Sequence, residues 1–222
     1  RQMCIRDRIN NSINMTNKDY AFNSDELKKK YNLKKCALLN DWEAIAYSYD
    51  SVSNDIEYIK KGASFNKTKL FLGPGTGLGA SISINDIVLP TEIGNTFHSY
   101  LSLQKNYEFE SQKSLVLEDL ISGSAISNMY EIKTNHKISS EEVLKKSRQD
   151  DPQAKIIING FIKSLAETLS ELAMTFMPGD GIFLAGNLIR NIYDDINKEN
   201  FNETFLSNRK NVHKEMLDMI TI

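Results

Sequence analysis

The feature that most constrains the fold is a glycine-rich stretch at residues 70–79, which reads Leu-Phe-Leu-Gly-Pro-Gly-Thr-Gly-Leu-Gly. Three apolar residues precede four glycines at alternating positions, and an alternating run of apolar residues and serines follows at residues 80–84. This order predicts a strand, a tight glycine loop and a second strand. The N–H groups of such a loop suit phosphate oxygens, and Thr76 adds a hydroxyl donor. An ordinary glycine hairpin is the alternative interpretation.

Several classes of protein are excluded or disfavoured. A Walker A loop is excluded, because it requires a Lys-Ser/Thr pair after the glycines and none follows here. A dinucleotide-binding fingerprint is disfavoured, because a strand is expected where that motif has a helix. A net charge of −2 over 222 residues disfavours nucleic acid and anionic membranes as main partners. Cys4 and Cys36 form no ligand cluster, and neither a membrane span nor a secretory signal is visible. We therefore expect a cytoplasmic protein.

A second candidate site lies at Asn40 and Asp41. Residues 35–40 have the pattern of a short buried strand, and residues 41–47 have the pattern of a helix. The pair is therefore expected where a strand ends and a helix begins, which is where ligands gather in open α/β sheets. The alternative is that one of the two side chains only caps the helix.

Further polar residues are expected near the same place. Residues 82–90 alternate around Asn-Asp, a hairpin signature that brings Glu92 and Asn95 towards the glycine loop. Glu118 lies among apolar residues in the segment that leads to Gly123. The alternative is that it only belongs to the solvent-exposed face of a helix.

The second half of the chain predicts a long helix followed by a strand and a turn. Asp151 and Pro152 have the types preferred at a helix start, and the apolar stripe that follows is interpreted as core. Residues 182–185 predict a buried strand, which Gly186 turns into another helix.

Taken together, these segments resemble the bacterial glucokinases, ATP-dependent hexokinase-type enzymes of the actin-like ATPase fold. The likeness extends from about residue 14 to residue 222 and includes six motifs in the family's order. They are residues 15–22, 39–41, 73–79, 89–95, 118–123 and 182–187.

The resemblance implies an α/β (α+β) chain with the actin-like ATPase or ribonuclease H-like hexokinase fold, in two lobes with the small lobe incomplete. Residues 1–8 are expected to be a non-native scar, residues 9–50 a remnant of the small domain, and residues 51–222 the large domain, truncated at its C-terminal end. The family's first phosphate loop and its last glycine-rich segment have no counterpart here. We therefore expect the chain by itself to be inactive or nearly so.

The resemblance also implies roles for individual residues. Asp41 is the expected catalytic base, which accepts the proton of the glucose 6-hydroxyl as that hydroxyl attacks the γ-phosphate of ATP. The residues expected to bind the sugar are Asn40, Glu92, Asn95 and Glu118. The residues expected to bind ATP are Gly75, Thr76, Gly77 and Gly186. Mg²⁺ is expected to accompany ATP, and no residue is assigned as its ligand.

The sequence departs from the family at several of these positions. Asn95 stands where the family has His, Thr91 and Ile93 replace two glycines of the sugar turn, and Asn187 replaces a glycine of the last turn. The sugar is therefore less determined than the kinase chemistry, and the resemblance allows a homodimer without indicating its interface.

Three alternatives to a glucokinase of glycolysis remain open. They are a kinase for another hexose or an amino sugar, a non-catalytic sugar sensor or degenerate kinase, and a purely structural actin-like protein. No DNA-binding helix-turn-helix is recognised, which disfavours the sensor. No cysteine-rich zinc motif follows the sugar turn, which disfavours the related branch of repressors and kinases. Convergence of the polar side chains in space would separate an enzyme from a structural protein.

Overall fold

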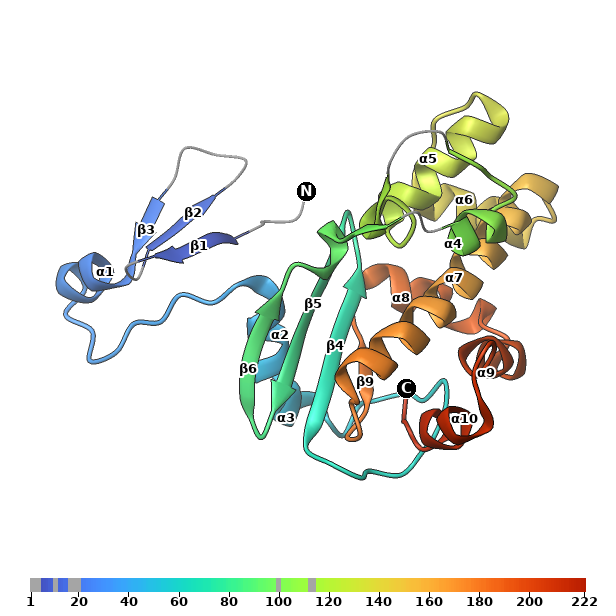
Figure 1. The fold of residues 1–222 in the computed structure, drawn as a ribbon. Coiled ribbons are helices and arrows are strands. Elements are labelled where there is room, and N and C mark those ends of the chain that lie inside the picture. Colours follow the sequence, from blue (N-terminus) through green and yellow to red (C-terminus); the bar gives the residue numbers. More distant parts are fainter. Residues whose placement is uncertain (1–4, 10–11, 16–20, 99–100, 112–114) are drawn as a thin grey trace.

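The structure is a computed structural model that describes residues 5–9, 12–15, 21–98, 101–111 and 115–222. At its centre lies a four-stranded sheet with the order β6-β5-β4-β9 (Figure 1). The strands are β4 (Thr68–Pro74), β5 (Leu78–Ile84), β6 (Ile87–Thr91) and β9 (Ile182–Leu184). β4, β5 and β6 are antiparallel neighbours, whereas β9 runs parallel to β4.

Both predicted hairpins of this sheet are confirmed. β4 and β5 pair up to Pro74 and Leu78, so that residues 75–77 form the turn. Between β5 and β6, Asn85 and Asp86 have φ angles of 50° and 66°. Two consecutive positive φ angles match the right-handed twist of the flanking strands, which is why Asn and Asp are favoured there.

Strand β4 is buried on both faces, and its successive side chains point to opposite sides of the sheet. Leu70 and Leu72 of β4 belong to the large core, whereas Phe71 belongs to a smaller cluster with Trp42. The same alternation in β9 puts Ile182 into the large core and Phe183 against the smaller cluster.

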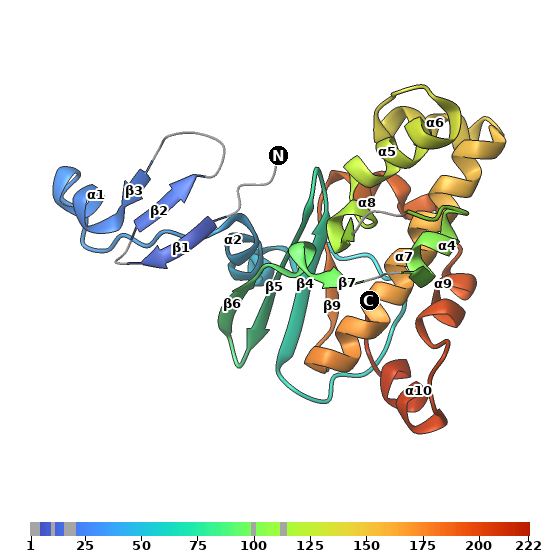
Figure 2. The same cartoon turned by 45° about the horizontal axis from the view of Figure 1, so that its top comes forward.

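Helix α7 (Pro152–Phe176) is the long helix predicted from the apolar stripe. It begins after the N-cap Asp151 and ends at Met177, which adopts a left-handed φ of 50°. Helices on several sides of α7 pack against it, as Figures 1 and 2 show. They are α4 (Leu101–Asn106), α5 (Gly123–Thr134), α6 (Ser140–Arg148), α9 (Lys198–Phe205) and α10 (Asn211–Asp218).

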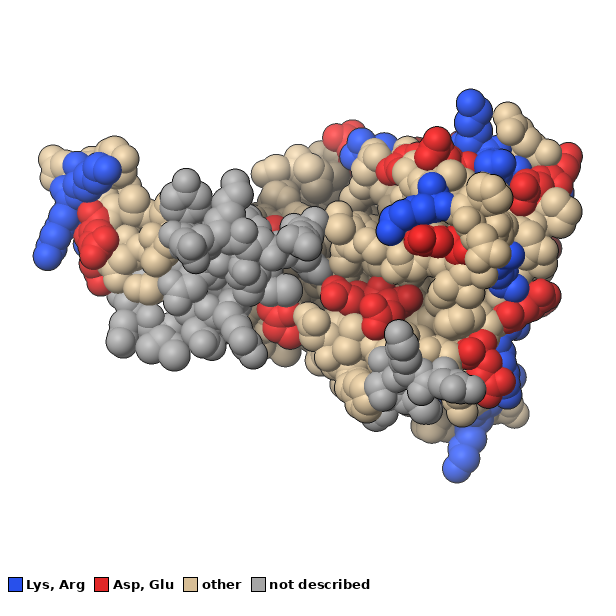
Figure 3. Space-filling view, turned by 90° about the horizontal axis from the view of Figure 1, so that it is seen from above, with Lys and Arg blue, Asp and Glu red and all other residues tan. Residues whose placement is uncertain are grey.

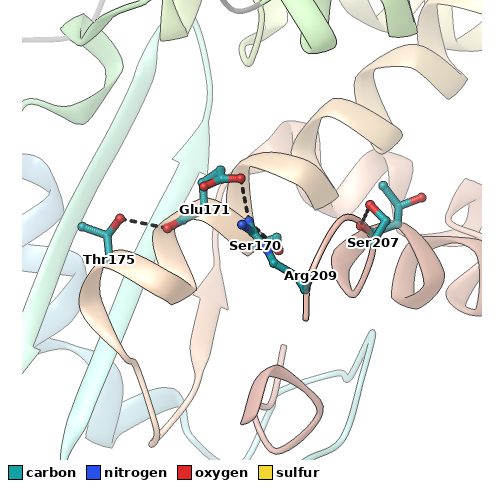
Figure 4. A network of polar contacts seen from close by, with 6 residues as sticks. Ser170, Glu171, Thr175, Ser207 and Arg209 are labelled. Atoms are coloured by element: carbon teal, nitrogen blue, oxygen red, sulfur yellow. Dashed lines mark hydrogen bonds and ion pairs between the residues drawn. The ribbon is translucent and has the colours of Figure 1, made fainter. Parts of the chain in front are cut away.

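Polar contacts tie α7 to the segment that links α9 to α10 (Figure 4). Arg209 donates to the Ser170 hydroxyl over 3.2 Å and to Glu171 over 2.5 Å. Ser170 is buried and Glu171 is largely exposed, so the guanidinium bridges the core and the surface. Within the described part of the chain every helix is too short or too polar to cross a membrane.

The opposite face of the sheet is covered by α2 (Asp41–Tyr47), which is followed by α3 (Tyr49–Val52). The predicted helix at residues 41–47 is therefore confirmed. The strand predicted at residues 35–40 is wrong, because this segment has no regular structure and Leu39 is 38% exposed. Its apolar run finds no neighbouring strand among the described residues, and a strand needs a paired backbone to form.

The first residues form a separate small sheet of three antiparallel strands. The strands are β1 (Ile5–Ile9), β2 (Ser12–Met15) and β3 (Ala21–Asn23), and α1 (Ser24–Lys30) follows. Figures 1 and 2 show this unit to one side of the central sheet. The side chain of Asn23 caps helix α1. Residues 5–8, which we set aside as non-native, take part in β1, and their origin stays a prediction.

Candidate active site

A cavity of about 270 Å³ lies at the end of the sheet where β4 turns into β5. Three distant segments meet there: the start of α2, the glycine turn, and the end of β9. The lining residues are Asp41, Trp42, Ile45, Gly73, Pro74, Gly75, Thr76, Gly77, Ala185 and Gly186. The predicted base and the predicted ATP-binding residues are therefore brought together.

Asp41 is presented by a well-capped helix start. Asn40 is the N-cap of α2: its Oδ1 accepts the Glu43 N–H over 2.6 Å, and its own N–H donates to Glu43 Oε2 over 2.9 Å. The capping alternative therefore applies to Asn40, which leaves its amide nitrogen for a ligand. The Asp41 carboxylate is exposed, and its Oδ1 accepts the Trp42 N–H over 3.0 Å.

The glycine turn offers backbone donors to the cavity. The Gly75 carbonyl accepts the Gly123 N–H over 2.7 Å, and the Thr76 carbonyl accepts the Ser124 hydroxyl over 2.6 Å. In a trans peptide the N–H points away from the carbonyl, so the N–H groups of Thr76 and Gly77 point away from α5. Neither donates to a described residue, and two adjacent free N–H groups suit a phosphate.

A left-handed backbone does not explain the glycines of this stretch. The glycines with positive φ in the described chain are Gly181 and Gly186, so none of the four loop glycines uses the left-handed region. At Gly73 the reason is lack of space for a side chain. A Cβ atom at Gly75 would have no neighbour within 4 Å, whereas one at Gly73 would collide with the Trp42 ring.

Three of the four predicted sugar-binding residues, Glu92, Asn95 and Glu118, gather around Leu78, directly after the turn, whereas Asn40 lies at the start of α2. Glu118 Oε2 accepts the Leu78 N–H over 3.3 Å, and Asn95 donates to Glu92 Oε2 over 3.2 Å. A Cβ atom at Gly94 would lie 2.4 Å from the Leu78 carbonyl oxygen, so the turn that carries Glu92 and Asn95 packs directly on Leu78. These three residues lie outside the lining of the cavity and flank the same glycine turn.

Two short 3-10 turns carry these residues. They are η1 (Ile93–Asn95) and η2 (Leu117–Asp119), which are linked by a Leu117 N–H bond to the Thr96 carbonyl over 3.1 Å. Strands β7 (Phe97–His98) and β8 (Leu115–Val116) pair beside them. Figure 3 looks down on this end of the sheet and shows acidic side chains in the middle of the face.

Two departures from the family pattern have structural explanations. The Thr91 hydroxyl donates to the Ala80 carbonyl over 3.0 Å, and the Ile93 side chain packs against the large core. Both larger side chains are therefore accommodated by contacts within the protein.

Gly186 lies two residues after the end of β9, has a φ of 110° and is the N-cap of α8 (Asn187–Ile192). It also lines a second cavity of about 800 Å³, whose wall includes Tyr49, Phe71 and Phe183. These three rings contact one another with centroids 4.6–5.8 Å apart.

Two groups beside this aromatic cluster have shifted pKa values. Burial, helped by the charge of Asp180, raises the pKa of Tyr49. Burial alone would lower the pKa of Lys69, but the hydrogen bond and charge of Asp180, 2.9 Å away, outweigh it and raise that pKa. Lys69 is therefore a positively charged partner of Asp180, at the opposite end of β4 from the glycine turn.

Sequence reasoning missed the residues that hold the site together. Trp42, Ser81 and Ser124 all bond or pack against site residues, and none belongs to a motif that we recognised. One signal was available, because Trp42 is the single tryptophan and follows Asp41 directly. Within the described residues, no group of three or more His, Cys, Asp or Glu side chains is arranged to hold a metal ion.

Comparisons with known proteins agree with this arrangement. A family model described as Glucokinase matches residues 7–222. The glucokinase of Helicobacter pylori (strain J99) is 28% identical over 218 residues, which cover 87% of this chain and 65% of the relative. The chain therefore spans about 65% of the length of that curated relative.

Solved structures agree with the fold. The crystal structure of a glucokinase from an Antarctic psychrotroph has a TM-score of 0.77 at 21% identity, covering 95% of this chain and 70% of that one. A ROK family glucokinase from Streptomyces griseus, in complex with glucose and AMPPNP, has a TM-score of 0.56 at 17% identity. The match covers 82% of this chain and 62% of that one. The predicted actin-like ATPase fold is thereby confirmed.

Proposed function

The chain belongs to the glucokinase family, and from this premise we propose that it is the part of an ATP-dependent hexose kinase that carries the catalytic base and the second phosphate loop. The reaction is the transfer of the γ-phosphoryl group of ATP to the 6-hydroxyl of glucose, which is the entry step of glycolysis. The proposal takes the cytoplasm as its location and places residues 9–50 in the small domain and residues 51–222 in the large domain.

One observation carries this proposal: the 270 Å³ cavity brings the Asp41 carboxylate beside residues 73–77 and Gly186. These residues come from three separate motifs, and the first and the last of these lie more than 100 positions apart in the chain. Phosphoryl transfer needs little covalent help from a protein and depends on positioning and charge stabilisation. A carboxylate next to free backbone N–H groups supplies both a base and an anion site.

Asp41 takes the proton in this proposal. Its Oδ1 already accepts the Trp42 N–H, so Oδ2 is the oxygen that accepts the proton of the sugar 6-hydroxyl. The hydroxyl oxygen forms a bond to the γ-phosphorus, the bond from that phosphorus to the bridging oxygen breaks, and ADP leaves. The proton stays on Asp41 until the product departs.

Backbone donors hold the nucleotide. The N–H groups of Thr76 and Gly77 face away from α5 and bind phosphate oxygens, with the Thr76 hydroxyl as a further donor. Gly75 and Gly186 leave open space beside them, because a Cβ atom at either would have no neighbour closer than 4.0 Å. Mg²⁺, bound with the nucleotide, would offset the phosphate charge.

The sugar is held by paired acceptors and donors. Glu92 and Glu118 present carboxylates around Leu78, and Asn95 presents an amide beside Glu92. Hydroxyl groups both donate and accept, so carboxylates next to amides match them. The 28% identity to the H. pylori enzyme leaves another hexose or an amino sugar as the alternative substrate.

The test is ATP-dependent phosphorylation of glucose, mannose, glucosamine and other hexoses by a form that extends over the full length of the relatives. Glucose turnover should fall about a thousandfold in Asp41→Ala, while glucose binding by calorimetry stays within about threefold. Asp50→Ala is the matched control, because Asp50 is an equally exposed acid on the next helix, outside the 270 Å³ cavity.

Each outcome separates the alternatives. Turnover that survives in Asp41→Ala would overturn the role of Asp41 as base. Sugar binding without turnover in the unmutated protein would support the sensor or degenerate kinase. The 222-residue chain assayed alone should show little activity, and a longer form that is no more active would contradict that expectation.

A further inference from the structure

We infer that Trp42 is a positioning residue that couples occupancy of the glycine turn to the orientation of Asp41. The inference rests on the proposed function, because it takes Asp41 as the base and residues 75–77 as the phosphate site. Trp42 is the single tryptophan of the chain, and it lines the same cavity as both of these groups.

The indole of Trp42 rests directly on the backbone of Gly73, two residues before the turn. A Cβ atom at Gly73 would lie 2.1 Å from Cη2 and 2.2 Å from Cζ2 of the indole. The indole is 7% exposed and packs in the smaller cluster with Phe71 and Val88. Because interiors are close-packed, a shift of β4 near the turn must move the indole.

The backbone of Trp42 connects this contact to the carboxylate. Its N–H donates to Asp41 Oδ1 over 3.0 Å, and its carbonyl oxygen accepts the Ser81 hydroxyl over 2.8 Å. Ser81 is fully buried in the middle of β5. The first turn of α2 is thus anchored to the sheet through Ser81 and to the end of β4 through the indole.

Two consequences follow from this arrangement. Phosphates that bind to the turn change the surroundings of the indole. Loss of the hydrogen bond from Ser81 keeps the Asp41 carboxylate but lets it move. A shift of about 1 Å at a reacting group can cost about a hundredfold in rate.

The first experiment follows tryptophan emission of the 222-residue chain, in which it reports Trp42 alone. Mg·ATP and Mg·ADP should each change the emission in a saturable way, with the midpoint equal to the dissociation constant from equilibrium dialysis, whereas adenosine should not. Bound ATP without any change in emission would overturn the coupling and leave the proposed function standing. ATP that fails to bind in dialysis would overturn both.

The second experiment compares Ser81→Ala with Ser83→Ala in the full-length form. Both serines are buried on β5, two residues apart on one face, and Ser81 alone bonds to Trp42. Ser81→Ala should lower kcat about tenfold or more with the KM values for ATP and hexose within about twofold. Ser83→Ala should leave kcat unchanged, and equal effects of the two variants would overturn the inference.

A third comparison separates position from simple stability. Trp42→Phe keeps a ring against Gly73 and both backbone hydrogen bonds, so it should retain most of kcat, whereas Trp42→Ala should lose it. Thermal unfolding of both variants shows whether each remains folded at the assay temperature. A Trp42→Phe variant that is folded but as impaired as Trp42→Ala would contradict positioning by the ring.

Discussion

The backbone N–H of Gly123 donates a hydrogen bond to the carbonyl oxygen of Gly75 over 2.7 Å. With the Ser124 hydroxyl on Thr76, 2.6 Å away, it holds two successive carbonyls of the glycine turn against the first turn of α5. The corresponding N–H groups are directed to the other side. The start of α5 therefore determines which side of the turn can receive an anion.

Ser124→Ala should weaken ATP binding without affecting the sugar. The variant loses one hydrogen bond to the turn, and a net loss of about 1 kcal/mol corresponds to about a fivefold higher dissociation constant for Mg·ATP. Equilibrium dialysis measures this constant. Ser127→Ala, on the same helix but without a contact to the turn, is the control and should bind ATP normally. Equal affinities in both variants would contradict the role of α5.

Gly94→Ala should destabilise the protein, whereas Gly75→Ala should leave its stability unchanged. A methyl group at Gly94 would meet the Leu78 carbonyl oxygen at 2.4 Å, whereas one at Gly75 would meet nothing within 4 Å. Gly94→Ala should lower the free energy of unfolding by about 1–3 kcal/mol and weaken sugar binding, because Glu92 and Asn95 move with the turn. Gly75→Ala should unfold like the parent in urea, and a similar loss in both variants would refute the packing argument.

The parts of the fold that were predictable depend on local chemistry. The Asn-Asp turn, the Asp151 cap and the apolar stripe of α7 each satisfy a backbone or packing requirement within a few residues. The strand predicted at residues 35–40 was wrong because a strand depends on partner strands elsewhere in the chain.

The sequence predicted which residues belong to the site but not the contacts that hold them in place. Motif order named Asp41 and the glycine turn, and the structure brings them to one cavity. The capping role of Asn40 was weighed as an alternative and is observed. The contact of the Trp42 indole with Gly73 and the hydrogen bond from Ser81 to Trp42 join residues 31 and 39 positions apart, with no sequence pattern between them, so only the folded chain reveals them.

Tyr107→Phe should destabilise the protein and alter its alkaline unfolding. The Tyr107 hydroxyl is buried and donates to the Leu120 carbonyl over 2.5 Å, so its loss leaves that carbonyl unpaired at a cost of about 1–3 kcal/mol. Burial raises the pKa of Tyr107 above its usual value. A raised folded pKa gives stability that is complete below the unfolded pKa of about 10 and is lost as pH rises above it.

The measurement is urea unfolding of the parent and Tyr107→Phe from neutral pH to about pH 11. The parent should lose stability more steeply above about pH 10, so that the two curves converge. Tyr130→Phe is the control, because Tyr130 is buried on α5 and its hydroxyl has no partner among the described residues. Parallel curves for parent and Tyr107→Phe would contradict the assignment.

Glu142→Gln should remove part of the acid sensitivity of α6. The Ser139 N–H donates to Glu142 Oε2 over 3.0 Å, and the Ser139 hydroxyl accepts the Glu142 N–H, which completes a capping box. The backbone hydrogen bond from Ser139, then the bond to its side chain, lowers the pKa of Glu142. A lowered folded pKa gives stability that is present above the unfolded pKa of about 4.3 and is lost as pH falls through the folded value.

Stability measured by urea unfolding should therefore fall less between about pH 6 and pH 3 in Glu142→Gln than in the parent. Glu141→Gln changes the same charge one residue earlier, outside the capping box, and should keep the pH dependence of the parent. Ser139→Ala should lose about 1 kcal/mol at neutral pH, as expected for a missing N-cap. If Glu141→Gln and Glu142→Gln flatten the acid limb equally, net charge and not the capping box controls the acid stability of this helix.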